Sequence, residues 1–295
     1  MHKFMRTIGF GMYENRQDMD KLLKKLAKEA TGQLCLNESD NSQLYELRAE
    51  VAPGIGVAMA GRINNRGTFS REYYFPYVLS HEISSRSDCS IQRHAERETF
   101  AGLLDEYRVG ISLIFYMENS LELRVRRQEK LPSVPKGVAL SALSVRGKIL
   151  LPVQKTSQQS EALKQAAQKR TSLLEAAKRG DEDAIETLTV EDIDLYSMVS
   201  RRVAREDIYS IIETCFMPCG VECDQYSIIG TILGTETRTN RITKEEIYLL
   251  KLECNDILFS VAINKKDLLG EPLPGRRFKG PVWMQGTVSF EPDTM

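Results

Sequence analysis

The chain has 295 residues, with 40 basic and 41 acidic side chains, so its formal net charge is −1 at pH 7. This near balance excludes a globally basic nucleic-acid binder and a highly acidic disordered chain. Hydrophobic residues make up 42% and charged residues 27%, which is ordinary for globular proteins. The length predicts about two domains.

The N-terminal residues contain neither an apolar stretch of signal-peptide length nor a small-residue cleavage site. The longest largely apolar run, residues 109–117, is less than half of the roughly 20 residues that a membrane span needs. Six cysteines are sparse for this length, which favours reduced thiols over a disulfide framework: Cys35, Cys89, Cys215, Cys219, Cys223 and Cys254. We therefore expect a soluble, cytoplasmic protein with no membrane partner.

Along the chain, residues 1–12 are apolar and glycine-punctuated, which predicts a short strand or an anchored arm. Residues 15–30 are expected to form a helix capped by Asn15, because apolar side chains recur at helical spacing: Met19, Leu22, Leu23 and Leu26. The period then changes to two, which predicts strands over residues 44–51, 55–63 and 68–79, the last two joined by a hairpin loop.

A second helix is predicted over residues 90–107, followed by strands over residues 111–117 and 121–127. Two more strands, residues 138–145 and 148–153, are expected to pair across the Arg146-Gly147 turn. Together these elements predict an α+β domain over residues 1–153, built from an antiparallel sheet covered by two helices.

Residues 156–179 contain neither proline nor glycine and carry a helical apolar stripe with an excess of cationic residues. Gly180 suits the end of this helix, and Asp181 suits the cap of a second one that runs to residue 188. Residues 189–202 are ambiguous, because residues 192–199 alternate like a strand and a helix fits nearly as well. The narrow, alanine-rich stripe favours packing on the protein's own domains or on another subunit rather than on a membrane.

Residues 206–215 predict one more helix, which ends a helical linking segment over residues 154–215. The remaining strands are predicted over residues 226–236, 245–253, 257–263 and 282–290. Short strands joined by hairpins, with glycines at the bends, predict a small β-barrel or a curled antiparallel sheet over residues 216–295.

Three cysteines lie close together in Cys215-Phe-Met-Pro-Cys219-Gly-Val-Glu-Cys223, and with Cys254 they could form a tetrahedral zinc site. Structural zinc sites usually take their thiolates from two tight pairs, whereas this cluster has equal spacings and Cys254 lies in a predicted strand. We therefore interpret the cluster as a helix end, a turn and a strand, and we expect no metal and no other cofactor.

His94 and Glu98 lie at i and i+4 of the predicted helix, where they could supply two metal ligands or an acid–base couple. The second histidine of a His-Glu-x-x-His protease helix is missing. The neighbouring Arg93 and Arg97 favour a salt-bridged surface instead. The pair is thus a candidate catalytic site only if the chain is an enzyme.

Basic residues gather near Phe278 and the only tryptophan, Trp283: Lys265, Lys266, Arg276, Arg277 and Lys279. A small barrel can bind a single nucleic-acid strand through a basic groove and stacking aromatic rings. Acidic residues interleave at Asp267 and Glu271, however, and Trp283 lies in an apolar strand, where core packing is the default.

Three stretches resemble a known family: the opening Met-His-Lys-Phe-Met-Arg-Thr-Ile-Gly-Phe, Phe216-Met-Pro-Cys-Gly-Val-Glu-Cys-Asp-Gln-Tyr-Ser-Ile-Ile-Gly and Gly275-Arg-Arg-Phe-Lys-Gly-Pro-Val-Trp-Met-Gln-Gly. The chain resembles a family of uncharacterised bacterial proteins, carried as a domain of unknown function in anaerobic Gram-positive bacteria. The resemblance covers the whole chain. It implies a bacterial cytoplasmic protein, and it brings no activity, cofactor or catalytic residues with it.

The main interpretation is non-catalytic, since the sequence contains no recognisable nucleophile–base arrangement and no phosphate-binding motif. We expect the protein to bind a partner protein or a small ligand, or to self-associate as a homo-oligomer. Locally acidic stretches, residues 182–194 and 206–224, keep partner binding open despite the balanced total. One alternative is nucleic-acid binding through the C-terminal barrel. The other is an enzyme of unrecognised class, for which His94 with Glu98, and then Asp224 beside Tyr226, are the first positions to test.

Overall fold

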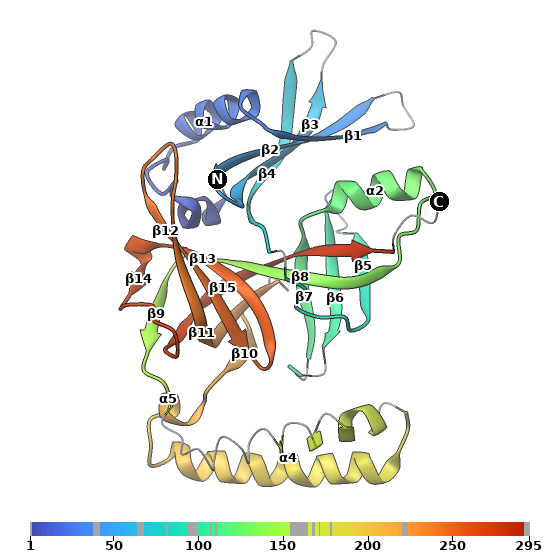
Figure 1. The fold of residues 1–295 in the computed structure, drawn as a ribbon, viewed down its shortest axis with the longest axis vertical. Helices are drawn as coiled ribbons and strands as arrows, with labels where there is room; N and C mark the ends of the chain where they lie inside the picture. Colours follow the sequence, from blue (N-terminus) through green and yellow to red (C-terminus); the bar gives the residue numbers. More distant parts are fainter. Residues whose placement is uncertain are drawn as a thin grey trace.

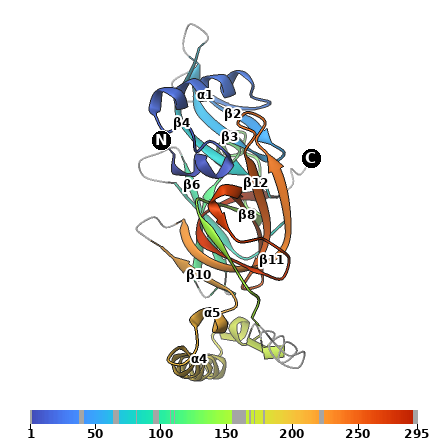
Figure 2. The same cartoon turned by 90° about the vertical axis from the view of Figure 1, so that its left-hand side faces the viewer.

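The computed structural model of this protein describes residues 2–37, 42–63, 68–80, 82–93, 99–106, 108–109, 111–153, 165–166, 169–170, 172–177, 179–219 and 224–291. Two β-sheets form its body, and a helical segment projects from one end of that body (Figure 1). The same arrangement is seen at right angles in Figure 2. The mixture of helices and sheets confirms the predicted α+β class.

The N-terminal sheet is antiparallel, in the order β1-β2-β3-β4. Its strands are β1 (Gly32–Asn37), β2 (Gln43–Ala52), β3 (Ile55–Ile63) and β4 (Phe69–Val78). The strands predicted over residues 44–51, 55–63 and 68–79 are therefore confirmed, and β1 adds a fourth.

Helix α1 (Arg16–Lys28) packs on the N-terminal sheet and confirms the helix predicted over residues 15–30. Asn15 caps it, since its side chain accepts a hydrogen bond from the backbone N–H of Asp18 at 2.8 Å. The predicted apolar face is buried: Met19, Leu22, Leu23 and Leu26. The first residues form a 3-10 helix, η1 (Lys3–Ile8), and are anchored by buried apolar side chains rather than extended as a strand.

Among the described residues, the second sheet has 11 strands and is mostly antiparallel, in the order β10-β11-β12-β13-β8-β15-β7-β6-β5; β9 pairs with β15, and β14 pairs with β9. Its elements are β5 (Cys89–Arg93), β6 (Phe100–Glu106), β7 (Ile111–Met117), β8 (Pro135–Ser144), β9 (Gly147–Leu150), β10 (Cys215–Pro218), β11 (Gln225–Thr239), β12 (Glu246–Cys254), β13 (Ile257–Asn264), the 3-10 turn η2 (Lys265–Asp267), β14 (Leu268–Leu269) and β15 (Arg277–Phe290). The strands predicted over residues 111–117, 226–236, 245–253, 257–263 and 282–290 correspond to β7, β11, β12, β13 and β15. This one sheet takes strands from both sides of the boundaries predicted at residues 153 and 216.

Part of the second sheet curls back on itself. The pairings run from β11 through β12, β13, β8 and β15, and β15 pairs again with β11. Strand β11 allows this because residues 225–231 pair with β15 whereas residues 231–239 pair with β12. The result is the curled sheet of the prediction, partly ringed but not a barrel. Residues 216–295 do not form it alone, because β8 comes from the first half of the chain.

The helix predicted over residues 90–107 is wrong. Its described residues form β5 and β6, which pair antiparallel with each other, and β6 pairs on with β7. Phe100 and Leu104 are buried at alternate positions of β6. Gly102 lies against the ring of Phe115, where an added Cβ atom would come within 2.1 Å of a ring carbon. Burial at every second residue, together with the glycine that the Phe115 ring requires, therefore explains why this segment is a strand despite its helical spacing.

The strand predicted over residues 121–127 is also wrong, because this segment forms helix α2 (Ser120–Gln128). Its Leu-Glu-Leu-Arg-Val-Arg alternation is typical of a strand. In the helix, Leu121 packs with Leu36 and Leu44 of the N-terminal sheet, whereas Leu123 joins the core of the second sheet. Residues two apart point about 200° apart on a helix, so an alternating pattern also suits a helix buried between two layers.

The strands predicted over residues 138–145 and 148–153 exist as β8 and β9, but their predicted pairing across Arg146-Gly147 is wrong. Strand β8 pairs with β13 and β15, and β9 pairs with β14 and β15. Gly147 packs closely on the ring of Phe278 in β15. Contacts with a distant strand therefore outweigh the local turn.

The projecting segment contains helix α4 (Glu182–Val203) and the short helix α5 (Ile208–Ile211). Residues 189–202, which fit either a helix or a strand, are helical within α4. The helix predicted over residues 206–215 shortens to α5, and Cys215 already begins β10. Most of the helix predicted over residues 156–179 lies outside the described residues, but those described between 165 and 177 are helical. None of the helices in the described ranges has the length and apolar character needed to cross a membrane.

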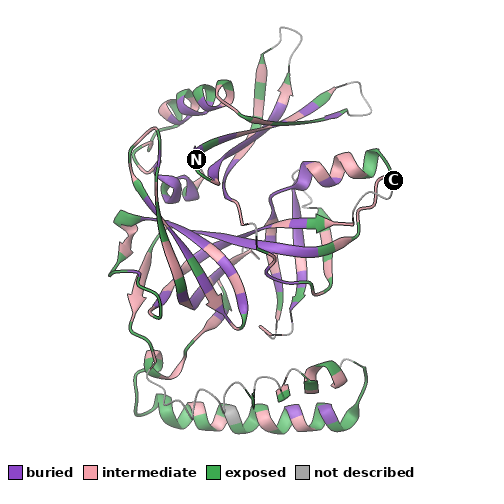
Figure 3. Ribbon diagram, in the orientation of Figure 1, coloured by how far each residue is buried: buried purple, intermediate pink, exposed green. Residues whose placement is uncertain are grey.

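Burial is concentrated in the two sheets, whereas the projecting segment is largely exposed (Figure 3). One core fills the second sheet and includes Phe115, Leu140 and Phe259. The other lies between η1, α1 and the N-terminal sheet, and Trp283 and Leu249 of the second sheet join it. The two sheets thus share apolar packing and form one body.

Candidate functional site

The helical arm, residues 151–214, leaves the second sheet after β9 and returns to it at β10. Helix α4 lies apart from both sheets in the two views (Figure 1, Figure 2). Asp181 caps α4 as predicted, because its carboxylate accepts a hydrogen bond from the backbone N–H of Ala184 at 3.1 Å. The arm is therefore the most prominent surface feature of the molecule.

One face of α4 is covered within the arm. Ala184 and Leu188 are buried there. Two ion pairs join α4 to the preceding helical residues: Lys169–Glu191 at 3.1 Å and Arg170–Asp192 at 2.7 Å. The arm is thus a packed helical unit with one side already occupied.

A neighbouring face of α4 carries apolar side chains that contact mainly solvent. We call this set the exposed stripe, with these exposed fractions: Ile185 48%, Ile193 60%, Tyr196 76% and Val203 41%. The four side chains share a face because spacings of 8, 11 and 18 residues from Ile185 are about 2.2, 3.1 and 5 helical turns. Val190 and Met198, 53% and 52% exposed, lie farther round the helix. Large apolar side chains exposed on one side of a helix are a feature of interaction sites.

Arg277, the first residue of β15, ties both ends of the arm to the second sheet. Its Nε and Nη2 donate to the carbonyl oxygen of Leu151 at 2.9 and 2.7 Å. Its Nη1 donates to Ile212 at 2.5 Å, and Nη2 also donates to the carbonyl of Tyr209 at 2.7 Å. The side chain is buried, and burial lowers the pKa of the guanidinium. Arg277 therefore joins the two ends of the arm, at Leu151 and at residues 209–212, and we call this junction the root of the arm.

Tyr209 of α5 fills the same root from the arm side. The ammonium of Lys279 donates to its hydroxyl group and lies 4.1 Å from the ring centroid. The ammonium of Lys148 lies 4.9 Å from the same centroid. The hydrogen bond from Lys279 lowers the pKa of Tyr209. These contacts add to the Arg277 hydrogen bonds that position the arm.

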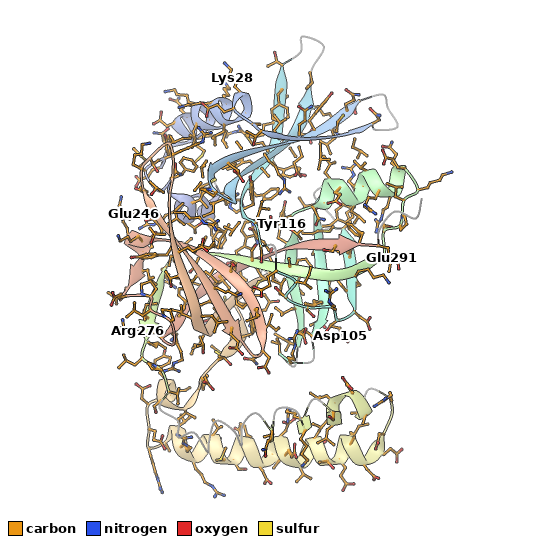
Figure 4. The ribbon with its side chains drawn as sticks, viewed as in Figure 1. Lys28, Asp105, Tyr116, Glu246, Arg276 and Glu291 are labelled. Atoms are coloured by element: carbon orange, nitrogen blue, oxygen red, sulfur yellow. The ribbon has the colours of Figure 1, made fainter. Side chains whose placement is uncertain are left out.

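The five basic residues predicted as a nucleic-acid site are distributed over separate contacts. Lys265 pairs with Glu246 and Lys266 with Glu245, at 2.7 Å each. Arg276 lies 3.6 Å from the carboxylate of Glu271, at the same edge of the molecule as Glu246 (Figure 4). Arg277 and Lys279 come together at the root of the arm instead. Each of the five side chains thus contacts groups of its own chain, and nucleic-acid binding at these residues stays a prediction.

The aromatic residues of that prediction are in the cores. Phe278 is fully buried, and Trp283 stacks on Phe4 at 5.2 Å between ring centroids. The indole N–H of Trp283 donates to Asp224 at 2.7 Å. Tyr116, between the two sheets (Figure 4), lies 5.1 Å from Trp283 between ring centroids. The aromatic groups therefore join η1 and both sheets.

The catalytic candidates fall in different places. His94 and Glu98 lie outside the described residues. Asp224 accepts the indole hydrogen bond of Trp283. The hydroxyl of Tyr226 accepts a hydrogen bond from the backbone N–H of Ile114 at 2.8 Å. Asp224 and Tyr226 thus hydrogen-bond to β15 and β7 respectively, and a catalytic role for them stays a prediction.

Two of the four cysteines named as zinc candidates are adjacent. The thiol of Cys254 lies 3.3 Å from the carbonyl oxygen of Cys215. Burial raises the pKa of both thiols. Cys219 is partly buried, and Cys223 lies outside the described residues. Within the described ranges, no three His, Cys, Asp or Glu side chains are grouped as metal ligands would be. The zinc alternative stays a prediction.

A buried group of charged residues lies between the two sheets, and the sequence analysis missed it. Arg48 donates from Nε to the Glu46 carboxylate at 2.8 Å and from Nη2 to the backbone carbonyl of Glu118 at 2.7 Å. The Glu118 carboxyl accepts a hydrogen bond from Ser141 Oγ at 3.0 Å. Burial raises the pKa of Glu46, and it raises the pKa of Glu118 to about 7. Glu118 therefore exchanges its proton near neutral pH.

Two acceptors beside this group are unsatisfied. Within the described part of the chain, Oε2 of Glu118 and Oε1 of Gln285 are buried without a hydrogen-bond partner. Gln285 lies opposite Ser141 in the β8–β15 register. A proton on Glu118 would turn one of these acceptors into a donor. The group can therefore hold a proton inside the body.

Sequence signals for these features were weak. Glu46 and Arg48 share a strand face with buried Leu44, and that mixture was the only sign of a buried charge. The role of Arg277 depends on contacts with residues 65 to 126 positions away, which no local pattern reveals. The exposed stripe was readable in principle, because its residues recur at helical spacing within residues 182–203.

The model of one protein family matches residues 5–286, nearly the whole chain, and that family is described as "Domain of unknown function, E. rectale Gene description (DUF3881)". The resemblance to a family of unknown function noted in the sequence is thereby confirmed. No curated protein and no solved structure matches this chain.

Proposed function

Because the chain belongs to DUF3881, a family defined as a domain of unknown function, we propose its role from its own geometry. It is a non-catalytic interaction protein that binds a partner protein through the exposed stripe of α4. The observation that carries this proposal is the exposure of Ile185, Ile193, Tyr196 and Val203 on a helix that projects from the body.

Burial of the exposed stripe would supply the free energy of binding. An isoleucine, valine or tyrosine moved fully out of water gains about 1.5–3 kcal/mol. The four side chains are 41–76% exposed, so a partner that covered them would gain a few kcal/mol before its other contacts are counted. Tyrosine is also enriched among residues that dominate binding energy.

The root of the arm favours a fixed presentation of this surface. Arg277 donates to carbonyl groups on the outgoing chain at Leu151 and on the returning chain at Ile212. A surface held in place before binding loses less conformational entropy when a partner docks. The root therefore supports a role for the arm in recognition.

The alternatives receive less support from the described residues. Asp224 and Tyr226 hold strands through hydrogen bonds to Trp283 and Ile114. The basic residues proposed for nucleic-acid binding contact acidic or carbonyl groups of the same chain. Both observations favour a protein partner over a substrate or a nucleic-acid strand.

We also propose a cytoplasmic location. Each of the described cysteines is an unpaired thiol: Cys35, Cys89, Cys215, Cys219 and Cys254. Unpaired thiols are typical of a reducing compartment.

Affinity capture from an extract of the source bacterium tests the proposal. The matched variants are Tyr196→Lys on the exposed stripe and Leu269→Lys on β14, since the two native side chains are 76% and 74% exposed. We expect the wild type and Leu269→Lys to retain the same protein and Tyr196→Lys to lose it. Equal retention by all three, or by none, contradicts the proposal.

A further inference from the structure

A series of hydrogen bonds crosses between the two sheets and is interrupted at one point. At one end, Arg48 of β2 donates to the carboxylate of Glu46 and to the backbone carbonyl oxygen of Glu118, which directly follows β7. At the other end, Nε2 of Gln285 in β15 donates to the backbone carbonyl oxygen of Pro76 in β4 at 2.8 Å. We call these five residues the polar bridge. Both of its ends lie in the N-terminal sheet, and its middle lies in the second sheet.

The interruption lies between two buried acceptors. Among the described side chains, Oε2 of Glu118 and Oε1 of Gln285 are buried without a hydrogen-bond partner. Ser141 neighbours both residues, since its hydroxyl donates to Oε1 of Glu118 at 3.0 Å and it lies directly opposite Gln285 in the β8–β15 register. The hydrogen bond to Pro76 fixes the orientation of the Gln285 amide, because a carbonyl oxygen needs the amide nitrogen as its donor. The amide therefore has an oxygen to offer on its other side.

The charges around Glu118 favour a neutral carboxyl group. The Arg48 guanidinium donates to the carboxylate of Glu46, but it meets only the backbone carbonyl of Glu118. An ionised Glu118 would thus add a negative charge that Arg48 does not balance. A buried charge costs far more free energy than a buried neutral group with a hydrogen bond. In keeping with this, burial raises the pKa of Glu118 to about 7.

The other ionisable groups near Glu118 do not change this balance. They come from β2, β4, β7 and α2: Glu46, Arg48, Tyr77, Tyr116 and Glu122. Burial raises the pKa of Tyr77 to about 12, and it also raises the pKa of Tyr116 well above its ordinary value, so both hydroxyls stay neutral. Glu122 is acidic. Within this set Arg48 is the cation, and Glu46 pairs with it at 2.8 Å.

We propose that Glu118 carries a proton on Oε2 and donates it in a hydrogen bond to Oε1 of Gln285, which latches the N-terminal sheet onto the second sheet. This one bond joins the two parts of the polar bridge, so that β2, β7, β15 and β4 become linked. Loss of the proton breaks the bridge and leaves a negative charge between the sheets. The inference concerns the body of the molecule and does not depend on the proposed function of the arm.

The latch makes the contact between the sheets sensitive to pH. When the sheets separate, water reaches Glu118, and its carboxyl regains an ordinary pKa of about 4.3. The raised pKa of about 7 in the closed molecule means that closure weakens as the pH rises towards 7 and then levels off. By linkage, the population of the open state should increase about tenfold between pH 6 and pH 8.

Infrared difference spectroscopy of the purified full-length chain tests the proton and its acceptor. Subtraction of the Glu118→Gln spectrum should leave a carboxylic acid C=O band at about pH 5.5 that disappears with a midpoint near pH 7. Gln285→Met, measured against its own Glu118→Gln double variant, should move this band to higher frequency, because the carboxyl loses its acceptor. Thr287→Val, two residues along β15, is the matched control and should leave the band in place.

Hydrogen exchange tests the latch itself. The amides of β3 are paired on both sides, so we expect them to exchange when the N-terminal sheet comes away and unfolds. After correction for the intrinsic effect of pH, they should exchange about tenfold faster at pH 8 than at pH 6. Glu118→Gln should abolish this difference, because its amide can donate to Gln285 at any pH. Gln285→Met should lose more protection at pH 6 than at pH 8, because only a protonated Glu118 donates to Gln285.

Three results would each overturn the proposal. The first is the absence of a carboxylic acid band between pH 5 and pH 8, which is also the result expected if a bound cation holds Glu118 ionised. The second is a band that keeps its frequency in Gln285→Met. The third is β3 exchange that is equal at pH 6 and pH 8 in the wild type, a measurement that needs no variant to fold.

Discussion

Arg277 donates two hydrogen bonds to the carbonyl oxygen of Leu151, where the chain leaves the second sheet for the arm. The same guanidinium reaches Ile212, where the chain returns. A single buried side chain thus joins two segments that are about sixty residues apart in the sequence. It links the position of a projecting surface to the packing of the body.

Arg277→Met should lower the free energy of unfolding by about 3 kcal/mol, because buried carbonyl groups lose a charged donor. It should also speed hydrogen exchange at α5 and around Leu151, since the root of the arm opens more often. Urea denaturation and hydrogen exchange measure the two effects. Arg277→Lys should recover only part of the loss, because one ammonium group cannot reproduce the fork of a guanidinium.

Arg276→Met is the adjacent control. The Arg276 side chain is 32% exposed and donates to the backbone carbonyl of Glu271. We expect a change within about 0.5 kcal/mol. A similar loss for both variants would show that the Arg277 hydrogen bonds are not what holds the root.

The buried Glu118 predicts a pH dependence of stability. Burial raises its pKa to about 7 in the folded state, above the value of about 4.3 expected in the unfolded chain. The contribution of Glu118 to the free energy of unfolding is therefore fully favourable below about pH 4, and it is lost as the pH rises through 7. Glu118→Gln removes this titration while keeping an acceptor for Ser141. We expect the variant to gain about 3 kcal/mol relative to wild type between pH 5 and pH 8.

The difference between Glu118→Gln and wild type isolates this one group. Burial raises the pKa values of Glu106 and Glu245, but hydrogen bonds and neighbouring cations together lower them on balance. Both groups titrate alike in the two proteins. Chemical denaturation at a series of pH values provides the comparison. A difference that stays constant from pH 5 to pH 8 would mean that Glu118 does not exchange a proton in this range.

Gly102→Ala distinguishes the observed β6 from the helix that the sequence predicts. In β6, the added methyl group meets the Phe115 ring, and overpacking should cost about 2 kcal/mol or more. In an exposed helix, the same change would gain about 1 kcal/mol. Thermal or urea unfolding therefore distinguishes the two structures, because Gly102→Ala lowers the free energy of unfolding in a strand and raises it in a helix. Gly234→Ala is the control, because a Cβ atom there has no neighbour within 4 Å, and it should be close to neutral.

Elements with one clear periodicity were predictable. Met19, Leu22, Leu23 and Leu26 define α1, and alternating residues define β2 to β4. A segment buried between two layers can show an alternating pattern that wrongly predicts a strand. Helix α2 is an example, because Leu121 and Leu123 face different cores. In β6, nothing in the local sequence around Gly102 excludes the predicted helix. Only its contact with the Phe115 ring shows why this position needs a glycine in a strand.

The candidate site was predictable in part for the same reason. The α4 stripe depends on local spacing, and Asp181 was found as its cap. The root was not predictable, because Arg277 acts on backbone carbonyls that only the folded chain brings together. Sequence reasoning assigned Arg277 to a basic surface, since an arginine that donates to carbonyl groups looks the same in a sequence as one that contacts phosphate.

Site-specific photocrosslinking in intact cells tests the interaction role of α4 most directly. A photoreactive phenylalanine analogue at position 196 samples the exposed stripe, and the same group at position 269 samples an equally exposed site on the body. We expect a defined protein adduct from position 196 and none from position 269. Adduct formation at position 196 no greater than at position 269 would contradict it.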